Sequence, residues 1–148
     1  MEILRKIASF GASKDDMKQI YFSFVRSQLE QSAVVWHSSL TEENKADLER
    51  VQKSAVKIIL GGQYNGYRNS LKNLNMETLD ERREKLCLNF AKRCLRNEKT
   101  SKSFPENSKN HVMKNRKQEK YQVQHANTKR FKESALIYMQ NLLNQQEK

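Results

Sequence analysis

Few residues of this sequence could hold a metal ion or a phosphate by a known motif. A polymerase binds its metal ions with two or more carboxylates placed on strands. The adjacent acidic pair Asp15 and Asp16 stands at the start of an expected helix and has no flanking strand. Carboxylates stabilise the positive end of a helix, so we interpret the pair as helix capping. Gly61-Gly62 lacks the Lys and Ser/Thr that complete a phosphate-binding loop.

The histidines and cysteines do not form a metal-ligand pattern. His37, His111 and His125 are far apart, and neither they nor Cys87 and Cys94 have zinc-site spacing. The cysteines lie seven residues apart in an expected helix, about 10 Å by helix rise. A disulfide needs Cα atoms within about 7 Å. We therefore expect free thiols in a reducing compartment, no metal, no cofactor and no catalytic residue.

Basic side chains give the stronger signal. Residues 99–132 hold ten Lys or Arg against Glu106 and Glu119, whereas residues 1–98 hold 17 Lys or Arg and 13 Asp or Glu. A basic block beside a nearly balanced one is typical of phosphate contact. A solvated tail without a partner explains the same composition.

The candidate nucleic-acid-binding residues lie in an expected helix over 79–96 and in the basic segment that follows it. They are Arg83, Lys92, Arg93, Arg96, Lys114, Arg116 and Lys117. Contacts from such side chains would reach a phosphate backbone, ignore base sequence and weaken with salt. Trp36 could stack on a base, but we expect it to close the core, with the His37 imidazole at the rim.

The positions of these residues depend on helices that the sequence marks clearly. Ser13 and Thr41 offer N-cap oxygens for helices over about 14–35 and 42–60, and Gly61-Gly62 suits a left-handed C-cap. Residues 78–81 form a capping box that opens the helix over about 79–96. Helical spacing predicts these buried stripes: Met17, Ile20, Tyr21, Phe24, Val25 and Leu29; Leu48, Val51, Ala55, Ile58 and Ile59; Leu79, Leu86, Phe90, Ala91, Cys94 and Leu95.

Composition then bounds the fold. With 36% apolar residues, one Pro and four Gly, the chain favours long helices and a modest core. We expect an all-α protein: a small helical bundle over 1–97, a flexible basic linker over 98–130, and a short C-terminal helix over 131–148. No apolar run exceeds five residues, which predicts no membrane span or signal peptide and an intracellular location in the nucleus or cytoplasm.

Six segments together resemble a known family in their order along the chain. They are Phe10-Gly11-Ala12-Ser13, Arg26-Ser27-Gln28-Leu29-Glu30, Val35-Trp36-His37-Ser38-Ser39-Leu40, Asp47-Leu48-Glu49-Arg50-Val51-Gln52-Lys53-Ser54-Ala55, Thr78-Leu79-Asp80-Glu81-Arg82-Arg83-Glu84-Lys85-Leu86-Cys87 and Phe131-Lys132-Glu133-Ser134. The series looks like the region after the palm in reverse transcriptases of non-LTR, LINE-type, jockey-like retrotransposons. The resemblance implies a helical, thumb-like region that helps hold the template–primer duplex of an RNA-directed DNA polymerase.

The sequence also departs from that family. The palm with its Tyr-x-Asp-Asp strand and the endonuclease domain are absent, Gln31-Ser32 replaces a Tyr-Ala type pair, and the tail lacks prolines. Because Met1 falls inside the helical region, we expect a truncated or decayed, non-catalytic copy with residual sequence-independent nucleic-acid binding. Two alternatives stay open: a module that packs a partner helix against the Leu48/Val51/Ala55/Ile58 stripe, and no selected function. The oligomeric state is left open.

Overall fold

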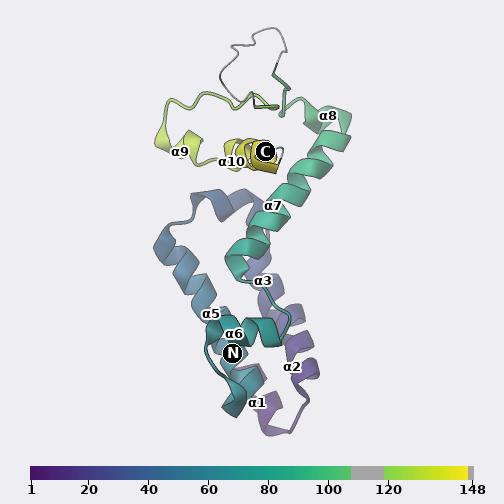
Figure 1. The fold of residues 1–148 in the computed structure, drawn as a ribbon, viewed down its shortest axis with the longest axis vertical. Coiled ribbons are helices and arrows are strands. Elements are labelled where there is room, and N and C mark those ends of the chain that lie inside the picture. The colour runs from purple at the N-terminus through teal and green to yellow at the C-terminus, as the bar shows by residue number, and fades with distance from the viewer. Residues whose placement is uncertain (108–118, 147–148) are drawn as a thin grey trace. The chain divides into compact units, whose positions relative to one another are not determined.

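The computed structural model describes residues 1–107 and 119–146. These residues form helices and no strand, which confirms the all-α prediction; one isolated antiparallel bridge joins Glu106 and Tyr121 (Figure 1). The helices are α1 (Glu2–Ser9), α2 (Lys14–Ile20), the π-helical segment η1 (Tyr21–Arg26), α3 (Ser27–Glu30), α4 (Ala33–Trp36), the 3-10 turn η2 (His37–Ser39), α5 (Glu42–Leu60), the 3-10 turn η3 (Gly61–Gln63), α6 (Tyr67–Asn73), α7 (Leu79–Arg96), α8 (Glu98–Ser101), α9 (Lys129–Lys132) and α10 (Ala135–Gln146).

The chain divides into two compact units. The N-terminal unit comprises Met1–Ala33 and Leu40–Arg83, and the C-terminal unit comprises Val34–Ser39 and Glu84–Lys148. The boundary therefore falls inside α7. This division differs from the expected bundle over 1–97 followed by a linker, because the second part of α7 packs with segments that come much later in the chain.

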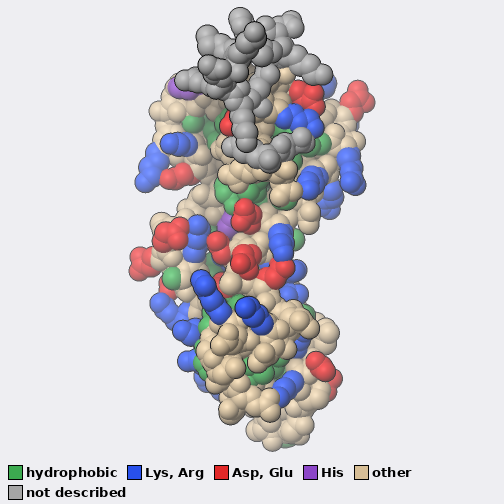
Figure 2. All heavy atoms as spheres, viewed as in Figure 1, with side chains coloured by type: hydrophobic (Ala, Val, Ile, Leu, Met, Phe, Trp, Pro, Cys, Tyr) green, Lys and Arg blue, Asp and Glu red, His purple; other side chains and the backbone are tan. Residues whose placement is uncertain are grey.

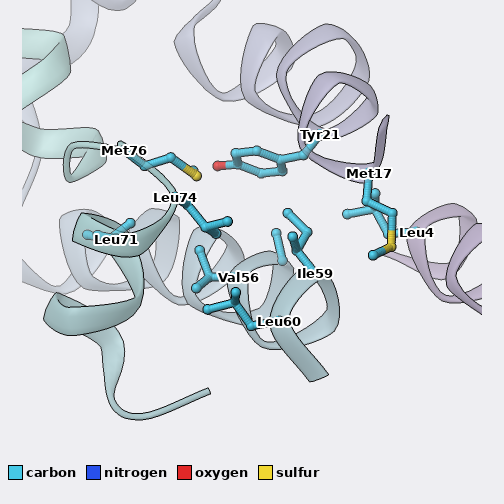
Figure 3. Close-up of a cluster of buried hydrophobic side chains, with 10 residues drawn as sticks. Leu4, Met17, Tyr21, Val56, Ile59, Leu60, Leu71, Leu74 and Met76 are labelled. Atoms are coloured by element: carbon cyan, nitrogen blue, oxygen red, sulfur yellow. The ribbon is translucent and has the colours of Figure 1, made fainter. Parts of the chain in front are cut away.

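The N-terminal unit is built around α5. Side chains from α1, α2, η1, α5 and the α6 region point toward one another in Figure 3. The enclosed set is Leu4, Met17, Tyr21, Ala55, Val56, Ile59, Leu60, Leu71, Leu74 and Met76. The buried face of α5 is rotated from the predicted stripe: Gln52 and Val56 are enclosed, while Leu48, Val51 and Ile58 are half-buried.

The predicted helix over 14–35 is wrong in two places. A π-helical segment widens the turn at Tyr21–Arg26, so side chains four apart no longer share one face. As a result Phe24, expected in the core, is 63% exposed. The helix then ends at Glu30, and Ser32 has a left-handed φ of 53°.

The predicted helix ends are confirmed where capping chemistry is local. Ser13 Oγ accepts from Asp16 N at 3.1 Å, and Thr41 Oγ1 accepts from Asn44 N at 3.2 Å. The backbone N–H of Thr78 donates to Glu81 Oε2 at 3.2 Å, and Glu81 N donates back to Thr78 Oγ1 at 3.2 Å. This reciprocal pair is the capping box that the sequence indicates.

The core of the C-terminal unit joins α7 to α10. Its enclosed apolar residues are Cys87, Ala91, Phe104, Tyr121, Met139, Leu142 and Leu143. The closing helix is thus part of a core. Phe90 is 37% exposed, so the prediction that its ring is buried between helices was wrong. Cys87 and Cys94 are not joined by a disulfide in the described structure, as their spacing predicts.

The expected flexible linker over 98–130 needs correction within its described parts. Phe104 and Tyr121 are buried, and Asn107 N donates to Lys120 O at 2.8 Å. Asn144 on α10 accepts from Tyr121 N at 2.9 Å and donates to Tyr121 O at 3.0 Å. Polar side chains of α10 therefore fix the segment around Tyr121, in which apolar residues do not recur at a regular spacing. Residues 108–118 lie outside the described part.

The Asn144 amide gives the first prediction. Asn144→Ala should lower the unfolding free energy by about 2 kcal/mol, because it leaves both backbone groups of Tyr121 without their partner. Trp36 is the only tryptophan and belongs to the C-terminal unit, so urea unfolding followed by its fluorescence reports on this unit.

The matched control for this experiment is Asn141→Ala. Asn141 is exposed on the same helix, so its loss should cost less than about 0.5 kcal/mol. Equal effects of the two substitutions would show that the Asn144 contact contributes nothing to stability.

Candidate nucleic-acid interface

The C-terminal part of α7 separates a buried face from a charged one. Cys87 and Ala91 are fully enclosed, while Lys92, Arg93 and Arg96 are exposed. Because residues three and four apart share a helix face, Lys92 and Arg96 lie one turn apart at the surface. The core contact of the helix thus fixes which cations face solvent.

These three cations have no carboxylate within 4 Å among the described residues. Lys92 Nζ lies 3.4 Å from Gln146 Oε1, and the Arg93 guanidinium carbon lies 5.7 Å from the Phe90 ring centroid. The described residues of the C-terminal unit include ten Lys or Arg and five Asp or Glu. Basic side chains are visible at its surface in Figure 2. The positive charge of this surface is therefore not neutralised locally.

Arg83 does not belong to this surface. Its side chain is 0% exposed, and its Nη2 lies 3.4 Å from Asp80 Oδ1. The prediction of phosphate contact assumed an exposed side chain, whereas the structure encloses the Arg83 guanidinium. The sequence spacing could have indicated this burial, because Arg83, Cys87 and Ala91 recur every four residues and so share the inward face of the helix.

The other predicted cations, Lys114, Arg116 and Lys117, lie outside the described residues. The aromatic expectation at residues 36–37 also changes. His37 is buried and its Nε2 lies 3.2 Å from Tyr138 Oη, whereas Trp36 is half-buried. The ring centroids of His37 and Tyr138 are 5.3 Å apart in an edge-on arrangement. The imidazole, not the indole, is the enclosed ring.

Beside this pair is a hollow that the sequence did not indicate. It has a volume of about 550 Å³ and is lined by Ser38, Lys129, Lys132, Glu133, Tyr138 and Asn141. Ser38 Oγ donates to Glu133 O at 2.7 Å, which holds the turn η2 against the segment between α9 and α10. The sequence feature that could have indicated this hollow is the spacing of Tyr138 and Asn141, which lie three residues apart and so share one face of a helix.

A second polar cluster occupies the N-terminal unit. Tyr21 Oη donates to Gln52 Oε1 at 2.7 Å, and Gln52 Nε2 donates to Tyr67 Oη at 3.0 Å. The Tyr67 hydroxyl donates to the Glu49 carboxylate, whose Oε2 also accepts Leu79 N at 3.0 Å. Glu49 thus meets the N-terminal end of α7, where a negative charge is stabilising. The cluster positions the start of α7 through the Glu49 carboxylate.

Burial raises the pKa of both phenols well above the usual tyrosine value; for Tyr67 the hydrogen bond to Glu49 adds to the rise. Next to Tyr21, Arg26 lies 3.5 Å from the Phe22 ring centroid, and Arg82 pairs with Glu30. Burial, followed by the like charge of Arg82, lowers the pKa of Arg26.

Within the residues that the structure describes, no group of three or more His, Cys, Asp or Glu could hold a metal ion. No described helix is long and apolar enough to cross a membrane. No family model matches the sequence, and no curated protein or solved structure matches it either.

The hydrogen-bonded phenols of Tyr21 and Tyr67 give the second prediction. A tyrosine that is neutral in the folded protein and ionises near pH 10 when unfolded stabilises the fold below that pH and loses this effect above it. The unfolding free energy should therefore fall as the pH rises beyond about 10. Absorbance at 295 nm reports the ionisation itself.

Tyr67→Phe is the test variant. It should leave the absorbance change up to about pH 11 unaltered, because the Tyr67 phenol does not ionise there in the folded chain. If the variant lost one tyrosine's absorbance change in this range, the half-buried, hydrogen-bonded position of Tyr67 would be contradicted.

Proposed function

We propose that this chain binds nucleic acid through the phosphate backbone, without catalysis, as a fragment related to the thumb-like C-terminal region of a retrotransposon reverse transcriptase. The observation that supports binding is the exposed set Lys92, Arg93 and Arg96, which lacks nearby carboxylates in the described chain. The family relation is supported by the ordered sequence segments alone.

The geometry of α7 suits a backbone rather than base edges. Helix rise separates Lys92 from Arg96 by about 6 Å, and one strand of B-DNA offers a phosphate every 3.4 Å or so along its axis. Both cations therefore reach the same backbone. Contacts of this kind orient a protein on a duplex but carry no sequence information.

The rival proposal is a protein-interaction module. Of the Leu48/Val51/Ala55/Ile58 stripe, Ala55 is enclosed in the chain's own core, while the other three side chains are half-buried and keep only part of their surface for a partner helix. Exposed apolar side chains elsewhere support this proposal, because they could contact a partner protein. The main ones are Phe10, which is 86% exposed, and Ile3 on α1. An apolar patch of several hundred Å² would be needed for a stable partner.

The third prediction tests the α7 cations. Arg93→Gln combined with Arg96→Gln should weaken binding to an RNA–DNA duplex, measured by fluorescence anisotropy over a series of salt concentrations. The log–log salt slope should become shallower by roughly two on duplex DNA, because each phosphate contact releases condensed counterions. Helix content should hardly change, since glutamine and arginine have similar helix propensities.

The matched control is Lys53→Gln combined with Lys57→Gln. These lysines are exposed on α5 in the N-terminal unit, so the control removes the same charge from another surface. If both double variants lose equal affinity and slope, net charge alone explains binding. If the Arg93/Arg96 variant binds like the parent, the α7 surface is only solvated.

The fourth prediction concerns catalysis. The purified chain should not extend a primer on an RNA template with Mg²⁺ or Mn²⁺, because the described residues form no strand that could carry carboxylates for two metal ions. Incorporation of labelled nucleotide is the measurement. Template-dependent incorporation that co-purifies with the chain through successive columns would overturn the non-catalytic proposal.

A further inference from the structure

We infer that the hollow between η2, α9 and the start of α10 is a nucleotide-binding subsite, in which Tyr138 stacks on the base and Lys129 and Lys132 contact the phosphate. The choice of ligand rests on the proposed nucleic-acid binding, but the site itself is distinct from the α7 cations. All its lining residues belong to the C-terminal unit.

The size and wall of the hollow suit a planar ring. Its volume of about 550 Å³ falls within the range of small-molecule sites. The Tyr138 ring is held in place, because its hydroxyl lies 3.2 Å from His37 Nε2 and its ring meets the buried His37 ring edge-on. An aromatic ring that is already oriented loses little freedom when a base stacks on it.

The polar groups suit the remainder of a nucleotide. Lys129 and Lys132 outnumber Glu133 among the charged lining residues. The Lys129 Nζ to Glu133 Oε1 distance is 3.9 Å, the lysine side chain is 88% exposed, and such a pair is weak. Lys132 has no ion-pair partner in the described chain. A phosphate monoester carries about −1.5 to −2 charges near neutral pH and complements this excess.

Asn141 supplies the base-reading group. It is exposed, lies one turn from Tyr138, and its amide makes no hydrogen bond in the described part of the chain. A side-chain amide offers two donors and one acceptor, which match the edge of a base. The hollow therefore combines a stacking ring, a free amide and two ammonium groups, the combination that a nucleotide requires.

The test uses the full chain labelled with ¹⁵N and titrated with AMP, adenosine, ribose 5-phosphate and an eight-residue oligothymidylate. AMP should shift the Asn141 side-chain amide resonance and should bind at least about tenfold more tightly than adenosine or ribose 5-phosphate, which lack the phosphate or the ring. Equal binding of AMP and ribose 5-phosphate, or no change at Asn141, would overturn the inference.

The variants separate this site from general charge effects. Lys132→Gln and Asn141→Asp should each weaken AMP binding several-fold, whereas Lys102→Gln, an exposed lysine of the same unit, should not. An equal loss in Lys102→Gln would also overturn the inference. If Lys132→Gln weakens the oligonucleotide as much as AMP, the subsite holds a residue of a strand; an effect on AMP alone identifies a free mononucleotide as the ligand.

The two proposals fail separately. AMP binding should be unchanged by the Arg93/Arg96 double substitution, and loss of duplex binding in that variant concerns the α7 surface only. AMP binding without any duplex binding would refute the proposed function and leave the nucleotide subsite standing.

Discussion

Buried amide side chains connect helices to irregular segments in both units, and most of the fold relies on them. Gln52 and Gln140 are fully enclosed, and Asn144 is nearly so. An enclosed amide without partners is costly, and each of these bonds to backbone: Gln52 to Glu77 O at 2.8 Å, Gln140 to Ser103 O at 2.9 Å, and Asn144 to both backbone groups of Tyr121. These hydrogen bonds add to the stability of the fold, which has a small apolar core because the chain has few apolar residues.

The same chemistry explains why the sequence predicted some parts and not others. Helix starts at Ser13, Thr41 and Thr78 depend on contacts within three residues, so local patterns sufficed. The order in residues 119–124 depends on α10, about twenty residues later, and on polar side chains that no hydrophobic period marks. A composition rich in Ser, Asn, Lys and Gln is typical of both linkers and segments fixed by a distant helix.

The candidate surface was predictable to the extent that it follows α7. The phase of that helix is fixed by Cys87 and Ala91, and once this phase is known Lys92 and Arg96 must lie outward and Arg83 inward. The prediction that every cation of this helix is exposed therefore failed for Arg83. The register shift at Tyr21–Arg26 was not accessible in the same way, because a π-helical turn changes the residue period that the analysis of apolar spacing assumes.

The Gln52 cluster has a consequence for how this sequence could vary. Its single amide serves the hydroxyls of Tyr21 and Tyr67, and Tyr67 in turn donates to the carboxylate that receives the first N–H of α7. Groups in one such network show strongly non-additive substitution energies. Related chains would therefore be expected to change these positions together, so a tyrosine-to-phenylalanine replacement at one of them should coincide with an apolar residue in place of glutamine. Their covariation would identify the shared fold even where overall identity is low.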